Sequence, residues 1–416
     1  MQIHLVAVGS HGDVLPILAL GVELIRRGHG VVLAAPVPFE GLARRAGVPF
    51  HGLGTRDTYE QAMREPDLWH PRRGVGTLFG GLSDLTEQTY HWLAQQHRRL
   101  REGLVVASSL SLGARIAQEK LGLNVITVHA MPLLVESRHA APLLPGLGLA
   151  GLMPSRVRHW LGRGADRYII GPAALPPLNA LRARLDLGPV RRLRYWWNSP
   201  SRVLLMFPDW FAAPQPDWLP QAVQTGFPIV DRLGDAQALS PALESMLAEG
   251  SPPLVFTYGS AMRKAQRFFS TAVSLCEYMG RRGILLSPQD GQIPPDLPKG
   301  VIHVPYAPLS VLLPRSAALI HHGGIGTVAQ ALAAGTPQLI VPVAFDHFDE
   351  AERVRRLGLG ASLSRRRFTP ARAARRLDSL LASPVVARRC RQVRERMAGE
   401  DGVSSACDRI EAMITG

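Results

Sequence analysis

The segment from residue 319 to residue 342 limits the possible folds more than any other part of the chain. Its apolar start, Leu319–Ile320, is followed by His-His-Gly-Gly-Ile-Gly-Thr, an alanine-rich stretch and a second apolar group, Leu339–Val341. This order predicts a buried strand, a glycine-rich turn, a helix and another strand, the unit of which parallel sheets with crossover helices are made. The unpaired N–H groups at the start of the helix then point into the turn and form an anion site.

The composition of the turn indicates that the anion is a diphosphate. Gly324 and Gly326 let the backbone approach a ligand closely, His322 can offer a proton or a positive charge to a phosphate oxygen, and Thr327 adds a hydroxyl. The glycine spacing differs from the phosphate loop of nucleotide hydrolases, which ends in Gly-Lys-Ser or Gly-Lys-Thr, and from the Gly-x-Gly-x-x-Gly turn of dinucleotide-binding domains. Neither of those two classes is therefore expected.

Short apolar strands alternate with helical stretches in both halves of the chain, which predicts an α/β protein. The predicted strands are 3–8, 31–35 and 104–108 in the first half, and 254–257, 283–286, 301–304, 318–321 and 339–341 in the second; helices are predicted at 14–27 and 112–121. The stretch 225–253 is rich in Pro, Gly, Asp and Ser and is typical of a domain connection. We expect two doubly wound, Rossmann-like domains, 1–228 and 229–416, which face each other across a ligand-binding cleft.

The first predicted strand ends in a second motif, Gly9-Ser-His-Gly-Asp-Val-Leu-Pro16. Polar residues at a strand-to-helix turn face the expected cleft, so Ser10, His11 and Asp13 can meet an acceptor hydroxyl there. Asp13 can equally be a helix N-cap, and a lone histidine beside glycines is often only a turn residue. A carboxylate at a helix start should also have a depressed pKa, which makes it a weak base unless its surroundings are dry. Inverting glycosyl transfer nevertheless requires such a base, opposite a stabilised diphosphate leaving group.

With these motifs the chain resembles the family 1 glycosyltransferases of the two-domain GT-B fold over essentially its full length. The amino-terminal motif is similar to that of bacterial members, and Asp13 falls on their catalytic base. The resemblance implies donor contacts by Tyr306 and Ala307 at the nucleotide base, His322, Gly324, Gly326 and Thr327 at the diphosphate, Ser260 at the phosphates, and Asp346 and His347 at the sugar. Within the family, segments such as 113–120, 207–218 and 345–353 look most like the rhamnosyltransferases of rhamnolipid biosynthesis.

Departures from the family pattern bear on the donor. His347 replaces a glutamine that is usual in the family, so a preference for glucose does not follow. Gln330 stands where many members with uridine donors carry a glutamate that binds the ribose diol, which favours a deoxythymidine donor. The resemblance therefore implies an inverting transferase that uses dTDP-rhamnose as co-substrate. We expect no further cofactor and no metal site, because the chain contains no Asp-x-Asp pair.

The stretch from His129 to Tyr195 should line the acceptor site. Met131-Pro-Leu-Leu-Val and the apolar segment 143–153 contain too many turn-forming residues for a regular core helix. We therefore expect an apolar, hydroxylated and lipid-like acceptor, bound by Ser10, His11, His129 and Met131. Alternatives are a uridine-diphospho-sugar-dependent transferase acting on a polyketide, a sterol or another small apolar alcohol, a nucleotide-sugar epimerase, and a non-catalytic auxiliary protein.

Arginines interleave with aromatic residues at 156–168 and 191–197, which is one way for a protein to contact an anionic membrane surface. The competing interpretation is an ordinary helix with solvated arginines and with Trp160 in the core. The net charge of +14 rests almost entirely on arginine, and the basic residues are scattered without a nucleic-acid-binding motif, so no nucleic acid partner is expected. The start of the chain predicts a strand and not a signal peptide, and the three cysteines lack metal or disulfide spacing. We expect a cytoplasmic protein, in peripheral contact with the inner membrane if the first interpretation holds.

Overall fold

The computed structural model describes residues 1–416 apart from 71–72, 101, 144–152, 234–237, 260–261 and 414–416. The chain forms two compact units. The first comprises Met1–Pro228 together with Asp401–Gly416, and the second comprises Ile229–Glu400. The chain therefore leaves the first unit, forms the second and returns to the first. The final segment, which the sequence analysis assigned to the carboxyl-terminal domain, belongs to the amino-terminal unit instead.

The first unit is built on a seven-stranded sheet with the order β3-β2-β1-β4-β5-β6-β7, in which all strands are parallel. The strands are β1 (Gln2–Val6), β2 (Gly30–Pro36), β3 (Phe50–Leu53), β4 (Leu104–Ser108), β5 (Val125–His129), β6 (Arg202–Leu205) and β7 (Ala222–Gln224). The strand order runs outward in both directions from the β1–β4 pair. The carboxyl ends of these two strands are therefore a topological switch point, where open α/β sheets bind ligands.

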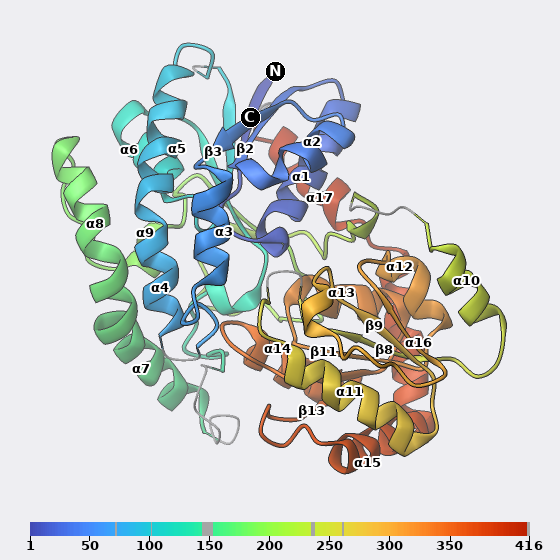
Figure 1. The fold of residues 1–416 in the computed structure, drawn as a ribbon. Coiled ribbons are helices and arrows are strands. Elements are labelled where there is room, and N and C mark those ends of the chain that lie inside the picture. Colours follow the sequence, from blue (N-terminus) through green and yellow to red (C-terminus); the bar gives the residue numbers. More distant parts are fainter. Residues whose placement is uncertain (71–72, 101, 144–152, 234–237, 260–261, 414–416) are drawn as a thin grey trace. The chain divides into compact units, whose positions relative to one another are not determined.

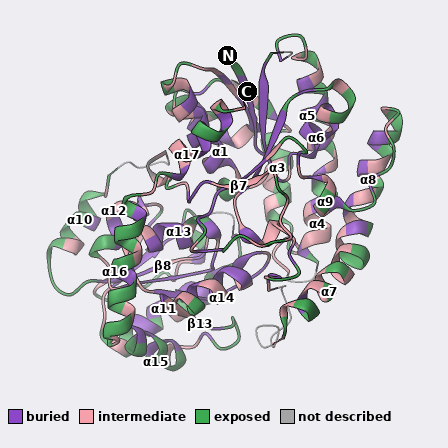
Figure 2. Ribbon diagram, turned by 180° about the vertical axis from the view of Figure 1, so that it is seen from behind, coloured by how far each residue is buried: buried purple, intermediate pink, exposed green. Residues whose placement is uncertain are grey.

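Helices surround this sheet (Figure 1). They are α1 (His11–Arg26), α2 (Glu40–Arg45), α3 (Arg56–Arg64), α4 (Gly74–Gly81), α5 (Ser83–Gln95), α6 (Leu112–Leu121), α7 (Ser155–Ala165), α8 (Gly171–Arg184), α9 (Leu193–Trp196) and α17 (Gly402–Glu411). Helices α4, α5, α6 and α8 share one apolar core with the strands. Every residue of β4 is buried, as expected for a parallel strand covered on both faces, and Figure 2 shows the strands as the most buried part of the ribbon.

The second unit contains a six-stranded parallel sheet with the order β10-β9-β8-β11-β12-β13. Its strands are β8 (Leu254–Thr257), β9 (Gly283–Leu286), β10 (Val301–Val304), β11 (Ala318–His321), β12 (Gln338–Ile340) and β13 (Gly360–Ser362). Its helices are α10 (Pro241–Ala248), α11 (Gln266–Met279), α12 (Leu309–Leu312), α13 (Ile325–Ala334), α14 (His347–Leu357), α15 (Pro370–Leu381) and α16 (Pro384–Ala398). The switch point of this sheet lies between β8 and β11. The expected class, two doubly wound parallel-sheet domains, is confirmed.

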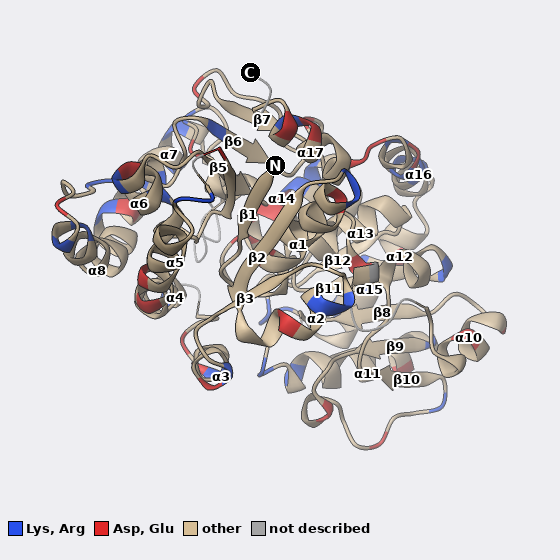
Figure 3. Ribbon diagram, turned by 90° about the horizontal axis from the view of Figure 1, so that it is seen from above, with Lys and Arg blue, Asp and Glu red and all other residues tan. Residues whose placement is uncertain are grey.

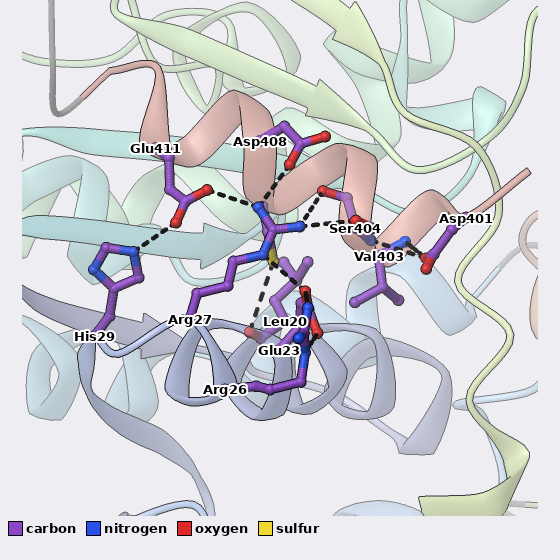
Figure 4. Close-up of polar contacts among 11 residues, drawn as sticks. Leu20, Glu23, Arg26, Arg27, His29, Asp401, Val403, Ser404, Asp408 and Glu411 are labelled. Carbon is purple, nitrogen blue, oxygen red and sulfur yellow. Dashed lines mark hydrogen bonds and ion pairs between the residues drawn. The ribbon is translucent and has the colours of Figure 1, made fainter.

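The last helix is held to α1 by a cluster of charged groups (Figure 4). Arg27, at the carboxyl end of α1, donates from Nη1 to Asp408 and Glu411 at 2.6 Å each and from Nη2 to the Ser404 hydroxyl at 2.8 Å. Its Nε donates to Glu23 at 2.7 Å. The Arg27 side chain is only 15% exposed, whereas its partner Asp408 is 65% exposed, so water reaches the acidic side of the cluster and each ion pair should contribute only modestly to stability.

Charged residues lie mainly on helices and loops, and the strands of both sheets are almost uncharged (Figure 3). Within the residues that the structure describes, no helix combines the length and the apolar character needed to cross a bilayer. In the same part of the chain, no three side chains of His, Cys, Asp or Glu are grouped as metal ligands would be.

Candidate active site

Asp13 lies at the switch point of the first unit, on the first turn of α1. Its Oδ2 accepts hydrogen bonds from the Ser10 N–H at 2.8 Å and from the Ser10 hydroxyl at 3.3 Å. The turn that precedes the helix needs glycine at residue 9, where φ is +132° and a Cβ would lie 2.3 Å from Asp13 Oδ2. Ser10 is the N-cap of α1, and Asp13, at the third helical position, completes a capping box with it. The interpretation of Asp13 as the N-cap itself is therefore wrong.

The expected depression of the Asp13 pKa is wrong. Burial raises the pKa of Asp13 to about 6, and the two hydrogen bonds from Ser10 lower it only in part. Removal of water from around the carboxylate outweighs the favourable helix start. The carboxyl group therefore remains largely ionised at neutral pH but has become a stronger base, which is the property that proton abstraction at pH 7 needs.

A shallow pocket opens beside Asp13 within the first unit. Apart from Asp13, its lining is mostly apolar and comes from α1, the ends of β4 and β5, and the segment after β5: Pro16, Ile17, Ser108, Ser109, Val128, Ala130, Met131 and Leu134. The Ser108 hydroxyl accepts a bond from the Val8 N–H at 3.2 Å, and the Ser109 hydroxyl donates to the Val128 carbonyl at 3.0 Å. Both serines therefore have partners without a ligand, so the carboxylate is the main polar group that the pocket offers.

The four residues expected at the acceptor behave differently. Met131 lines the pocket, and Ser10 hydrogen-bonds to Asp13 beside it. His11 is exposed on the first turn of α1, with its ring centroid 4.9 Å from that of Phe39. His129 does not line the pocket. Its side chain is buried, with Nδ1 at 2.7 Å from the Ser109 hydroxyl and Nε2 at 2.8 Å from Asn198 Oδ1, and burial lowers its pKa to about 4.

The glycine-rich turn of the second unit connects β11 to α13, as predicted. Gly324 is the N-cap of the helix, so the first free N–H groups are those of Ile325, Gly326 and their neighbours. Gly323 has φ of +103°, and a Cβ there would lie 2.8 Å from Ile340. A Cβ at residue 324 would lie 2.6 Å from His322 Nε2. The turn therefore requires both glycines, one for its backbone conformation and one for the position of the histidine.

His322 is buried under this turn. Its ring lies edge-to-face with that of His347, with centroids 4.7 Å apart, and Nδ1 has no hydrogen-bond partner among the described residues. Burial lowers the His322 pKa to about 4, so the ring is neutral at pH 7. Of the two contributions expected from His322, a proton or a positive charge, the positive charge is absent in the free protein. A neutral imidazole still offers one N–H to a phosphate oxygen.

The residues expected at the sugar lie at the start of α14. Asp346 and His347 are both buried, and the Ala344 N–H donates to His347 Nδ1 at 3.3 Å, which fixes the ring. Burial holds the His347 pKa well below its usual value. Gln330, on α13, is also buried, and its Oε1 has no partner among the described residues. A buried acceptor atom without a hydrogen bond is unusual in a folded protein, and a ligand hydroxyl could donate the missing bond.

For the residues expected at the nucleotide base and the phosphates, the structure gives fewer contacts. The Tyr306 hydroxyl donates to the Asp231 carbonyl at 2.5 Å, which sets the ring, and Ala307 beside it is buried. Thr327 lies in the first turn of α13, where its N–H donates to the Gly324 carbonyl at 3.0 Å and only its hydroxyl is left for a ligand. Ser260 lies outside the described residues.

Sequence reasoning missed Glu350, on the first turn of α14. Its carboxyl group is fully buried, neither oxygen has a hydrogen-bond partner among the described residues, and burial raises its pKa well above the usual value. Burial therefore favours the protonated form of this carboxyl group. The missed signal is its place in the sequence, because Glu350 follows the pair Asp346–His347 within one helical turn.

Comparisons with known proteins place this geometry in a family. Residues 3–139 match the glycosyltransferase family 28 N-terminal domain, and residues 284–413 match the erythromycin biosynthesis protein CIII-like C-terminal domain. O-mycaminosyltylonolide 6-deoxyallosyltransferase of Streptomyces fradiae is 31% identical, over 99% of this chain and 97% of the relative. The chain belongs to the GT-B glycosyltransferases. Glycosyltransferase GtfC of Amycolatopsis orientalis shares 33% identity with this glycosyltransferase, over 87% of the chain and 86% of the relative.

Solved structures show the same fold. The glycotransferase of kitacinnamycin aligns with this glycosyltransferase at a TM-score of 0.75 and 20% identity, over 99% of each chain. Spinosyn rhamnosyltransferase SpnG, solved with thymidine diphosphate, aligns at 0.67 and 18%, over 99% of this chain and 100% of that one. The expected family and the nucleotide-sugar co-substrate are confirmed.

Proposed function

We propose that this glycosyltransferase moves rhamnose from dTDP-rhamnose to a hydroxyl of an apolar, lipid-like acceptor, with inversion at the anomeric carbon. The observation that carries the proposal is the pocket at the first switch point, where a single carboxylate of raised pKa meets a wall that is otherwise mostly apolar. The apolar lining would contact the hydrocarbon part of the acceptor, and the carboxylate would accept a hydrogen bond from its hydroxyl.

In the proposed reaction Asp13 accepts the proton of the acceptor hydroxyl. The acceptor oxygen forms a bond to the anomeric carbon while the bond from that carbon to the diphosphate breaks. The diphosphate leaves with the electron pair, and the N–H groups at the start of α13, the dipole of that helix and the His322 N–H stabilise its charge. Asp13 and the acceptor belong to the first unit and the diphosphate to the second, so transfer needs groups from both.

Two features support the choice of donor. Gln330 offers a buried amide oxygen in place of a carboxylate, and an amide is the weaker acceptor for a ribose hydroxyl. SpnG is named a rhamnosyltransferase and was solved with thymidine diphosphate, and the relative VinC was solved with dTDP. For the sugar, His347 stands in a buried position beside Asp346, where an imidazole presents a different hydrogen-bonding pattern from the amide usual in the family.

A second acceptor class is favoured by the comparisons. The relative from S. fradiae is named for transfer to O-mycaminosyltylonolide, and a relative from Arabidopsis thaliana, 25% identical over 98% of this chain and 67% of its own length, is named a sterol 3-beta-glucosyltransferase. The first name specifies a tylonolide that already carries a sugar, and the second specifies a sterol. A rigid polyketide or polycyclic alcohol is therefore the alternative to a lipid chain.

The deciding experiment measures kcat/KM over a series of 3-hydroxyacyl acceptors of increasing length, with rhamnose and glucose donors, beside one polyketide and one sterol alcohol. Burial contributes about 0.8 kcal/mol per methylene, so kcat/KM should rise about fourfold with each added CH2 until the pocket is full. Met131→Ala should flatten this rise without weakening dTDP binding, because the change enlarges the acceptor pocket only.

Two results would count against parts of the proposal. A flat dependence on chain length, or turnover of the polycyclic alcohols alone, would remove the lipid acceptor and leave the transferase. Turnover with glucose and a uridine donor in preference to dTDP-rhamnose would remove the donor. If the protein is a non-catalytic auxiliary protein, no combination of donor and acceptor should be turned over, including combinations in which both compounds bind.

A further inference from the structure

Exposed aromatic side chains are concentrated on three adjoining elements of the first unit. These are α7, the π-helical turn Asp166–Ile170 that follows it, and α9. Trp160 is 73% exposed, Tyr168 72% and Tyr195 62%. Ile169 and Val157, on the same elements, are 45% and 43% exposed. Of the nine large apolar side chains that are exposed among the described residues, five belong to this group, so the clustering is not a general property of the surface.

These exposed residues contradict the interpretation of this segment as an ordinary core-facing helix. Trp160 lies in solvent and not in the core. Helix α8 continues the same run of chain and packs against α4 and α5, so the run is anchored to the unit from its far end (Figure 1). Arg194 anchors α9, since it donates to the Leu133 carbonyl at 2.7 Å and to Asp166 at 3.5 Å. The rings are therefore presented by a fixed surface.

Positive charge predominates around these rings, although Asp166 and Glu136 lie among them. The exposed arginines on or beside the three elements are Arg156, Arg163, Arg167, Arg191 and Arg192. Two of them pair with the same carboxylate, Glu136, at 3.7 Å for Arg163 and 2.8 Å for Arg192. Among the described residues, no carboxylate forms an ion pair with the other three. The Arg167 and Arg192 guanidinium groups also stack over Tyr168 and Tyr195, at 5.5 and 5.8 Å from the ring centroids.

We propose that this surface, the aromatic–arginine face, docks the glycosyltransferase on an anionic lipid bilayer. Tryptophan and tyrosine rings partition into the interface of a membrane, aliphatic neighbours such as Ile169 add buried area, and arginines beside them bind lipid phosphates. A second copy of the chain is a poor occupant, because a symmetric contact would bring the arginines of both faces together. Docking goes beyond the proposed reaction and does not depend on it.

The test is sedimentation of the full chain with vesicles of phosphatidylcholine alone and of phosphatidylcholine containing about one third phosphatidylglycerol. We expect binding to the anionic vesicles only, and binding should weaken as salt is added. Trp160→Ser/Tyr168→Ser and Arg156→Gln/Arg167→Gln should each lower the partition coefficient at least about tenfold, because the first pair removes two interfacial rings and the second removes two positive charges. All four side chains are exposed, so the variants should keep the melting temperature of the parent.

Matched controls come from the second unit. Tyr278, 64% exposed on α11, is replaced by serine, and the exposed pair Arg372 and Arg376 on α15 is replaced by glutamine. These variants should bind as the parent does. Equal binding by face and control variants, or no binding to anionic vesicles, would overturn the proposal. The proposal would also be overturned if the parent formed a dimer or bound a nucleic acid oligomer, and the face variants lost that association but still bound vesicles. Although the sequence places them in the stretch expected at the acceptor, none of the four substituted face residues lines the pocket beside Asp13. Transfer to a short, water-soluble acceptor should therefore be unchanged in every variant, which separates this proposal from the assignment of the reaction.

Discussion

Replacement of Asp13 by asparagine should stabilise the first unit at neutral and alkaline pH. The pKa of this carboxyl is raised from 3.8 to about 6 by burial, so the folded unit holds the proton more tightly than the unfolded chain does. Below pH 3.8 both states are protonated, and the group has no effect on stability. As pH rises towards 6, only the unfolded chain ionises freely, and the folded state loses stability relative to it. Above pH 6 that loss is complete.

The magnitude follows from the same pair of values. At about 1.4 kcal/mol per pKa unit, the difference between 3.8 and about 6 corresponds to about 3 kcal/mol. Asparagine is never ionised and escapes this loss, while its amide oxygen can still accept the hydrogen bonds from Ser10. Because Asp13 is partly exposed, water will reduce the effect, and we expect a gain of about 1 to 3 kcal/mol at pH 8 that shrinks towards zero near pH 4.

Urea unfolding followed by tryptophan fluorescence measures this gain directly. All seven tryptophans lie within Met1–Pro228, so the signal reports the first unit and not the second. Asp57→Asn is the matched control, because Asp57 is an exposed aspartate on the first turn of α3. It should give no gain at either pH. An Asp13→Asn protein that is no more stable than the parent at pH 8, or that shows the same gain at both pH values, would refute the reasoning.

Three further predictions concern the reaction. Asp13→Asn should lower kcat at least about a hundredfold while calorimetry finds dTDP binding unchanged, and the parent should lose kcat/KM as pH falls through about 6; turnover within about tenfold of the parent would exclude a general base. His322→Ala should weaken dTDP binding about tenfold, and Gly324→Ala should do the same because its Cβ displaces the His322 ring; equal affinity in calorimetry would remove His322 from the donor site. Transfer should persist in excess EDTA, since backbone N–H groups and the α13 dipole stabilise the leaving group; loss of activity that magnesium restores would contradict this.

The strands of the second unit were largely predictable because fully buried parallel strands form short apolar runs. Four of its strands begin and end at the predicted residues, and β12 differs from its prediction by one residue. The glycine-rich turn was predictable for the same local reason. The burial of the site residues could not be predicted from the sequence, because it depends on how segments far apart in the chain pack together. The sequence could therefore not reveal that His322 is neutral, that the Asp13 pKa is raised, or that His129 is bound by Asn198, which is far away in the chain.

The path of the chain through its two units affects how the protein can be divided. The second unit, Ile229–Glu400, is an insertion in the first, and Asp401–Gly416 completes the fold that begins at Met1. The junction is tight, because a Cβ on Gly402 would lie 2.5 Å from the Phe227 carbonyl. An isolated first unit would therefore need the last helix joined to residue 228 by a short linker. A second unit exchanged between relatives would have to be cut at both ends, near 228 and near 401. A single cut in the middle of the chain would separate Arg27 from Asp408 and Glu411 and leave it with Glu23 alone.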